Sequence, residues 1–221
     1  MNSKDVPIIE TVLGQRSYGE AAREYIEHAI EEVVSSLPNP ASLSPDERRG
    51  LIARYTAVLE GNFIYWMTAT YLSVRSDDGH AIIEDNLREE VRDNHPGMLR
   101  RFAVAARATS TDADRMVIDR DLQAVRGFVA RLAALEIILM MAFFEGFIQR
   151  FMPYLAELAV RQGSTEREYT DVHSVVDIAH TQGLITAFES ELSVTDGTVS
   201  ASTLFQGIEV LRTLINTIIR P

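Results

Sequence analysis

The sequence predicts an all-α protein, a bundle of about six to seven helices. Three observations predict it: helix start signals recur along the chain, the links between amphipathic runs are short, and the alternation of apolar and polar residues typical of a half-buried strand is missing. In such bundles the binding groups project inward from facing helices. The 221 residues are enough for one hydrophobic core, so we expect a single domain over residues 1–221.

The first two helices have the clearest start signals. The segment SYGE at 17–20 has the spacing of a capping box, and the amphipathic run that it opens ends at about Ser36. The segment SPDE at 44–47 places a serine at the N-cap, a proline at the first helical position and a glutamate at the third. We expect this second helix to continue through Glu60 to about Arg75.

Breaker residues delimit the later helices. The SDDG cluster at 76–79 ends the second helix, Pro96 forces a boundary at Asn94–His95, and Gly163 marks a further stop. Gly127 and Pro153 could kink or divide the long run in which they lie. The expected later helices are about His80–Asp93, a stretch ending at about Arg107, Asp112–Gln162, Thr165–Leu192 and Ser202–Ile219.

Charge and composition exclude some classes of partner and site. The formal net charge is -11, so the basic surface that neutralises phosphates is missing and we expect no nucleic-acid partner. The sequence has no cysteine, which excludes disulfides, thiolate metal sites and a cysteine nucleophile. Any bound metal must therefore have nitrogen and oxygen ligands.

Two segments bear on where the protein is located. The N-terminal segment MNSKDVPIIETVLGQRS lacks a basic stretch followed by a sustained apolar one, so we expect a cytoplasmic protein. The segment Leu132–Ile148 approaches membrane-spanning length, but it contains Glu136 and Glu145 and continues into a polar helix. We interpret it as a helix buried in a protein core, with no membrane partner.

The most informative motif is DVHSVVDIAH at 171–180. At 100° per residue, His173, Asp177 and His180 fall at about 0°, 40° and −20° around one helix, so all three leave the same face. That face continues with apolar residues, which indicates that it looks into the bundle. A solvated stripe or a hydrogen-bonded core histidine is the alternative. Burying three such groups unpaired would cost several kcal/mol, which favours a metal.

Three further residues are candidate ligands. Glu145 lies in FFEGF among large apolar side chains, while Glu136 is nine residues earlier and about 180° around the helix, so both cannot face one site. An arginine partner for Glu145 is the alternative. Glu60 is also followed by glycine among apolar and aromatic residues, and His95 precedes Pro96, where a histidine could equally be a cap.

The candidate ligands occur in the order glutamate, histidine, second glutamate and His-x3-Asp-x2-His helix. In this order the motifs resemble those of the heme-oxygenase-like diiron oxidases and oxygenases. The resemblance covers about Glu60 to Gly183. It implies that two ferrous ions are bound, that O2 is a co-substrate, and that a further carboxylate can come from Glu84, Glu89 or Glu90. Mixed nitrogen and oxygen ligands suit iron or manganese. The implied ligands are Glu60, His95, Glu145, His173, Asp177 and His180.

The resemblance also implies a small amine- or carboxylate-bearing substrate. An amino acid or a derivative is our first choice, oxidised by N-oxygenation, desaturation or bond cleavage in natural-product biosynthesis; some similar enzymes act on fatty acids. Arg150 and Arg101 are candidate anchors for a substrate carboxylate. An external electron donor fits this chemistry. A homodimer could form through apolar residues of the last helix, which include Leu211, Leu214, Ile218 and Ile219.

The sequence disfavours two related classes and leaves two alternatives open. Ferritin-like diiron proteins use Glu-x-x-His pairs, which this sequence does not contain, and thiaminase II-type chemistry needs a cysteine. A cofactor-independent or heme-binding member of the same fold superfamily is another alternative, with His28 as the only candidate heme ligand. The second open alternative is a non-enzymatic helical binding module, in which the polar residues form a structural network.

Overall fold

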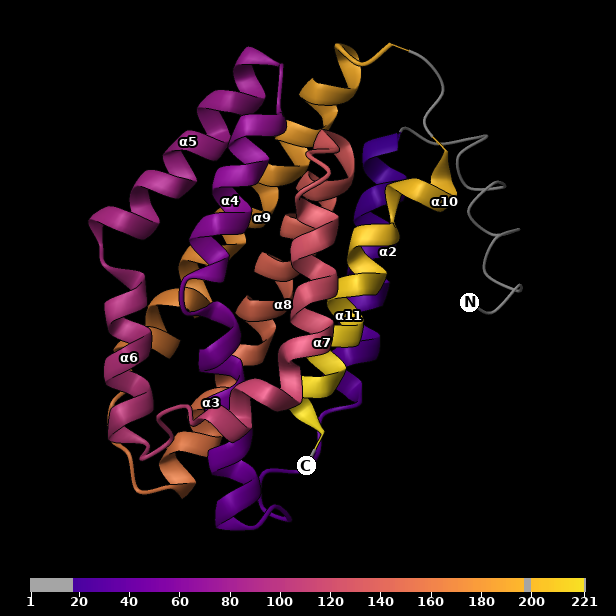
Figure 1. Ribbon diagram of the computed structural model, residues 1–221. Helices are drawn as coiled ribbons and strands as arrows, with labels where there is room; N and C mark the ends of the chain where they lie inside the picture. Colours follow the sequence, from indigo (N-terminus) through magenta and orange to yellow (C-terminus); the bar gives the residue numbers. More distant parts are fainter. Residues whose placement is uncertain (1–17, 197–199, 221) are drawn as a thin grey trace.

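The computed structural model describes residues 18–196 and 200–220, and these residues form helices and no strands (Figure 1). The predicted all-α bundle is confirmed. Three of the predicted helices are each divided in two. The helices are α2 (Tyr18–Ser35), α3 (Pro45–Leu59), α4 (Asn62–Ser73), α5 (Asp77–Arg92), α6 (His95–Ala105), α7 (Asp112–Val129), α8 (Ala134–Arg161), α9 (Glu168–Ser193), α10 (Ala201–Leu204) and α11 (Gln206–Ile219).

Left-handed backbone explains two of the divisions. Gly61 has φ 81°, a conformation that glycine adopts without steric cost, and it ends the predicted 45–75 helix after Leu59. The predicted 112–162 helix is interrupted at neither Gly127 nor Pro153. It breaks at residues 130–133, where Leu132 has φ 52°. The proline is instead accommodated inside α8.

The helix α8 forms the centre of the bundle. It packs against α9, α2, α11, α3 and α4 (Figure 1). All residues from Ile137 to Ile148 are buried, Glu145 included. The interpretation of this apolar segment as a core helix is thus confirmed. Among the described residues, no helix has the length and apolar character needed to cross a membrane.

A buried carboxylate fixes α5 against α9. The Glu191 side chain near the end of α9 is fully buried and accepts hydrogen bonds from the backbone N–H groups of Arg75 (2.8 Å) and Ser76 (2.9 Å), directly before α5. Hydrogen bonds to a carboxylate are stronger than neutral ones. They hold the start of α5 beside α9, and the polar site lies between these two helices farther along.

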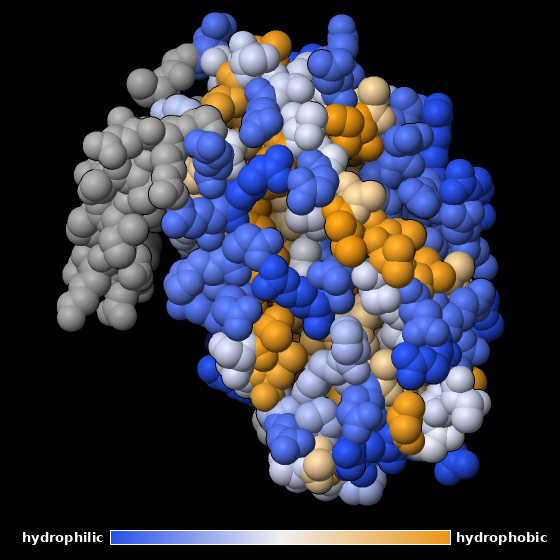
Figure 2. All heavy atoms as spheres, turned by 180° about the vertical axis from the view of Figure 1, so that it is seen from behind, coloured by the Kyte–Doolittle hydropathy of each residue, from blue (hydrophilic) through white to orange (hydrophobic). Residues whose placement is uncertain are grey.

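The last helix does not offer the expected dimer surface. Leu211, Leu214, Ile218 and Ile219 of α11 were expected to be exposed, but all are buried in the chain's own core, because α11 packs on α7 and α8. Figure 2 shows a mostly hydrophilic face with separate apolar areas. Exposed large apolar residues occur on different helices rather than along α11.

Candidate metal centre

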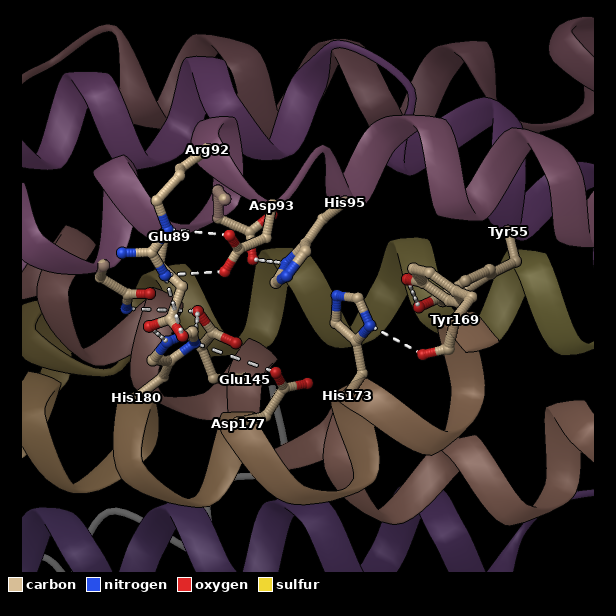
Figure 3. A network of polar contacts seen from close by, with 12 residues as sticks. Tyr55, Glu89, Arg92, Asp93, His95, Glu145, Tyr169, His173, Asp177 and His180 are labelled. Atoms are coloured by element: carbon tan, nitrogen blue, oxygen red, sulfur yellow. Dashed lines mark hydrogen bonds and ion pairs between the residues drawn. The ribbon is translucent and has the colours of Figure 1, made fainter. Parts of the chain in front are cut away.

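Two groups of buried acidic and histidine side chains lie together inside the bundle. One is Glu90, His95 and His173, named here the Glu90 cluster. The other is Glu145, Asp177 and His180, named here the Asp177 cluster. Within each group, one potential ligand atom of every residue lies within 4.8 Å of the others. Figure 3 shows His173, Asp177 and His180 leaving one side of α9 toward residues of the neighbouring helices.

Four helices bring these groups together. Helix α9 contributes His173, Asp177 and His180 from the single face that the spacing predicted, and α8 contributes Glu145. Glu90 is in the last turns of α5, and His95 begins α6. Asn94 between them has φ 56°, so the chain turns sharply and returns His95 toward Glu90.

The Glu90 cluster is internally hydrogen-bonded. His95 Nδ1 lies 2.7 Å from Glu90 Oε1, and His173 Nδ1 donates to the Tyr169 carbonyl at 2.8 Å. That bond fixes the His173 tautomer and leaves Nε2 as the ligand atom. Burial lowers the pKa of His173 to about 4. Burial would also lower the pKa of His95, but the Glu90 carboxylate outweighs it and raises that pKa.

The Asp177 cluster is only partly hydrogen-bonded. Asp177 is fully buried, and neither of its carboxyl oxygens has a hydrogen-bond partner in the described part of the chain. His180 Nδ1, 3.7 Å from Glu145 and 3.9 Å from Asp177, is likewise without one. On the other side of its ring, His180 Nε2 lies 3.1 Å from Glu89 Oε2. Asn86 Nδ2 donates to Glu145 Oε1 at 3.5 Å, while Asn86 Oδ1 is buried and unpaired within the described residues.

The electrostatics of the Asp177 cluster reflect excess negative charge. Burial raises the pKa of Asp177 well above its usual range, and the nearby Glu145 carboxylate raises it further. Burial also raises the pKa of Glu145. Burial would lower the pKa of His180, but Glu145 and Glu89 outweigh it and raise that pKa to about 9. A cation at this position would stabilise the Asp177 and Glu145 carboxylates in their charged form.

The residues present fit a pair of divalent cations. The unpaired oxygens of Asp177 and the unpaired Nδ1 of His180 are buried atoms that a metal ion would satisfy. Glu89, Glu90, Glu145 and Asp177 would carry four negative charges, which two divalent cations would balance. With three imidazoles this is a nitrogen and oxygen set suited to iron, manganese or zinc.

A pocket adjoins the Glu90 cluster. Its polar wall consists of Glu90, His95, Glu145 and His173. Its remaining wall is apolar apart from the tyrosine hydroxyl, and no arginine or lysine of the described chain lines it. The other lining residues are Leu59, Phe63, Ile64, Pro96, Leu99, Ile148 and Tyr169.

Several predicted residues are not brought to the clusters. Glu60 is exposed at the end of α3, where Arg100 lies 3.5 Å away. Arg101 pairs with Glu168 on the surface, and Arg150 pairs with Glu27 and Glu31, so neither arginine side chain faces the bundle interior. The reason is local, because acidic side chains of neighbouring helices hold both guanidinium groups outside.

Among the three candidates for a further carboxylate, Glu90 joins a cluster. Glu89 contacts His180, and Glu84 instead pairs with Arg88 at the surface. Glu136, which cannot face the same site as Glu145, pairs with Arg131. Sequence reasoning missed Asn86, and only its position four residues before Glu90 on the buried side of α5 could have indicated it.

The remaining histidines lie outside the clusters. The side chain of His28 is 73% exposed beside Glu32. His80 is half-buried: its Nε2 lies 2.6 Å from the Val74 carbonyl and its ring packs on Tyr71. Neither His28 nor His80 is placed to act as a metal ligand at the two clusters.

Comparisons of the chain with protein-family models, with curated proteins and with solved structures found no match.

Proposed function

We propose that this chain is a non-heme dinuclear iron oxygenase or oxidase that uses O2 to oxidise a small amine- or carboxylate-bearing substrate, with an amino acid or a derivative as first choice. One observation carries the proposal: two clusters of three buried ligand-type residues lie side by side, and Asp177 in one of them has both carboxyl oxygens unpaired within the described residues. Such a group is costly to bury unless it binds a cation.

The proposed ligands are those of the two clusters. Glu90, His95 and His173 would hold one ion, and Glu145, Asp177 and His180 the other. When bound, two ferrous ions would supply O2 with electrons that no side chain of this chain can provide.

Other residues of the chain orient the ligands. The Tyr169 carbonyl sets the His173 tautomer, the Glu89 carboxylate holds the outer nitrogen of His180, and the Asn86 amide holds Glu145. Such partners raise the basicity of ligands and fix their direction.

Iron binding by ligand variants tests the proposal. After anaerobic loading with Fe2+, His173→Ala, Asp177→Ala and His180→Ala should each retain less iron than the wild type and lose substrate-dependent O2 uptake, measured with a panel of amino acids. Circular dichroism should show that they remain helical. His28→Ala is the matched control, because His28 is exposed, and it should keep its iron.

A different result would decide against the proposal. Full iron content in the three ligand variants, together with loss of iron in His28→Ala, would favour the heme alternative. A folded wild-type protein that stays free of metal after anaerobic loading would favour the non-enzymatic alternative.

A further inference from the structure

Glu89 connects the surface of α5 to the Asp177 cluster. Among the described residues, it is the only carboxylate outside the two clusters that forms a hydrogen bond or ion pair with a cluster residue. Its Oε2 lies 3.1 Å from His180 Nε2 (Figure 3). The side chain of Glu89 is 35% exposed, that of His180 is almost buried, and that of Asp177 is fully buried. Exposure therefore falls from Glu89 through His180 to Asp177.

His180 is the cluster residue that solvent reaches most easily. It is 8% exposed, whereas the other five cluster residues are between 0% and 4% exposed. Its Nε2 faces Glu89, while its Nδ1 lies 3.7 Å from Glu145 and 3.9 Å from Asp177. One imidazole thus separates a partly exposed carboxylate from two buried ones. A displacement of Glu89 and this ring would open a polar route inward.

The pocket beside the Glu90 cluster offers a cation no comparable approach. Its wall includes the apolar side chains of Leu59, Phe63 and Leu99, and its carboxylates are the buried Glu90 and Glu145 of the clusters themselves. A divalent cation gives up its water only where oxygen or nitrogen ligands replace it. The polar approach to the centre is therefore on the α5 side, at Glu89.

The solvent side of Glu89 is held only weakly. Arg92 Nη2 lies 3.9 Å from Glu89 Oε1, but the same guanidinium group donates two shorter bonds to Asp93, at 2.8 and 2.7 Å. An exposed ion pair at such a distance contributes little to stability. The Glu89 carboxylate is thus free to turn toward a cation that arrives from solvent.

We propose that Glu89 captures divalent cations at the surface and passes them by way of His180 to the Asp177 cluster. The unpaired oxygens of Asp177 favour the inner position, because they have no other partner among the described residues. This inference deepens the proposed function: it assigns the entry residue of the same centre, and it rests on that function only for the binding of metal.

The kinetics of metal loading test the inference. Fe2+ is mixed anaerobically with the protein, and a chromogenic chelator traps the unbound ion at set times. Glu89→Gln should slow loading by about 10-fold, the size expected when local charge steering is lost. Release into excess chelator should slow by a similar factor, because ions leave by the route through which they enter. Glutamine keeps an oxygen that accepts from His180 Nε2, so the ring stays oriented and the final iron content should match the wild type.

Two further variants separate local capture from general charge. Glu84→Gln removes a carboxylate of the same helix with similar exposure, 40%, which pairs with Arg88, and it should load at the wild-type rate. Arg92→Gln removes the cationic competitor of Glu89 and should load faster than the wild type. Adding Glu89→Gln to Arg92→Gln should abolish that gain.

Three results would overturn the inference. They are a wild-type loading rate in Glu89→Gln, an equal slowing in Glu84→Gln, and faster release from Glu89→Gln with unchanged loading. The last result would mean that Glu89 only orients His180.

Loading with Mn2+, followed by the electron paramagnetic resonance signal of the free ion, separates this inference from the proposed function. If Mn2+ loading depends on Glu89 while the iron-loaded protein consumes no O2 with any substrate, the proposed function fails and the entry route stands. If O2 uptake is found and loading ignores Glu89, the entry route fails alone. A wild-type chain that retains neither ion would overturn both.

Discussion

Helix α9 buries two carboxylates completely, Asp177 in its N-terminal half and Glu191 near its C-terminal end, and the two differ in their hydrogen-bond partners. Glu191 accepts hydrogen bonds from two backbone N–H groups, and these outweigh burial so that its pKa is lowered. Asp177 has no such partner among the described residues, and burial raises its pKa. Both side chains are 0% exposed. Burial by itself therefore does not distinguish a structural carboxylate from a candidate ligand.

The difference lies in what the surrounding chain provides. Around Glu191 the fold supplies donors and gains a fixed junction between α4 and α5. Around Asp177 it supplies the Glu145 carboxylate and the His180 imidazole, both of which are ligand types. A fold that leaves such a group unpaired loses stability unless a cation completes the site.

The largest expected effect is an opposite change in the free energy of unfolding when Asp177 or Glu191 is replaced. In metal-free protein, Asp177→Leu should raise the free energy of unfolding by about 1–3 kcal/mol, because an unpaired polar group is replaced by an apolar one. Glu191→Leu should lower it by roughly 3 kcal/mol, because the Arg75 and Ser76 N–H groups lose their acceptor. Urea denaturation of both variants measures the two changes. Changes of the same sign would contradict the contrast drawn between Asp177 and Glu191.

The second effect is a dependence of metal affinity on pH. His180 has a folded pKa of about 9 against an ordinary value of 6.5, so its pairing stabilises metal-free protein fully below about pH 6.5 and is lost as the pH rises to 9. Metal must displace this proton, so affinity at the Asp177 cluster should rise up to about tenfold per pH unit across that window. Mn2+ titrations at several pH values measure it, and a flat profile would contradict it.

In the metal-free protein, the stability contributed by His173 depends on pH in the opposite direction to that contributed by His180. Its folded pKa of about 4 lies below the ordinary 6.5, so the stability it contributes is present above pH 6.5 and is lost as the pH falls toward 4. His173→Gln should reduce this acid loss. The His173→Gln variant should still lose, as the pH rises to 9, the stability that is assigned to His180.

A smaller effect is expected at Asn86. Asn86→Ala removes the amide that holds Glu145, and loss of such an outer partner should weaken metal binding at the Asp177 cluster by about 10-fold. The Glu90 cluster should keep its affinity. Competition with a fluorescent chelator measures both, and an equal weakening of the two ions would show that Asn86 acts through the fold.

The smallest effect is expected at Tyr169. Tyr169→Phe removes the buried 2.8 Å hydrogen bond between the Tyr169 and Tyr55 hydroxyls but keeps the backbone carbonyl that accepts from His173. Thermal unfolding should show a loss of about 1 kcal/mol. Iron content should match the wild type, and a fall in iron would mean that the hydroxyl pair takes part in the site.

Sequence patterns predicted the helical class and the shared face of α9 because both follow from local periodicity. His173, Asp177 and His180 converge whatever the rest of the chain does, since helix geometry alone sets their directions. Helix divisions were harder to predict, because Leu132 adopts a left-handed conformation that its residue type does not favour.

The remaining ligands depend on contacts between distant helices. Glu84, Glu89 and Glu90 are equivalent acidic residues in sequence, and only the packing of α5 on α9 separates the buried Glu90 from the surface Glu84. Glu60 and Glu145 share a following glycine and apolar neighbours. Glu60 nevertheless ends a helix at the surface, while Glu145 lies in the middle of the central helix. Tertiary packing therefore decides between residues that share a local pattern.

The most direct test of the central claim is the metal stoichiometry of the wild-type chain. Anaerobic titration with Fe2+, followed by removal of free metal and elemental analysis, should reach a plateau near two ions per chain, one for each cluster of three ligands. A plateau near one ion with a mononuclear spectroscopic signature, or no retained iron at all, would contradict the dinuclear centre.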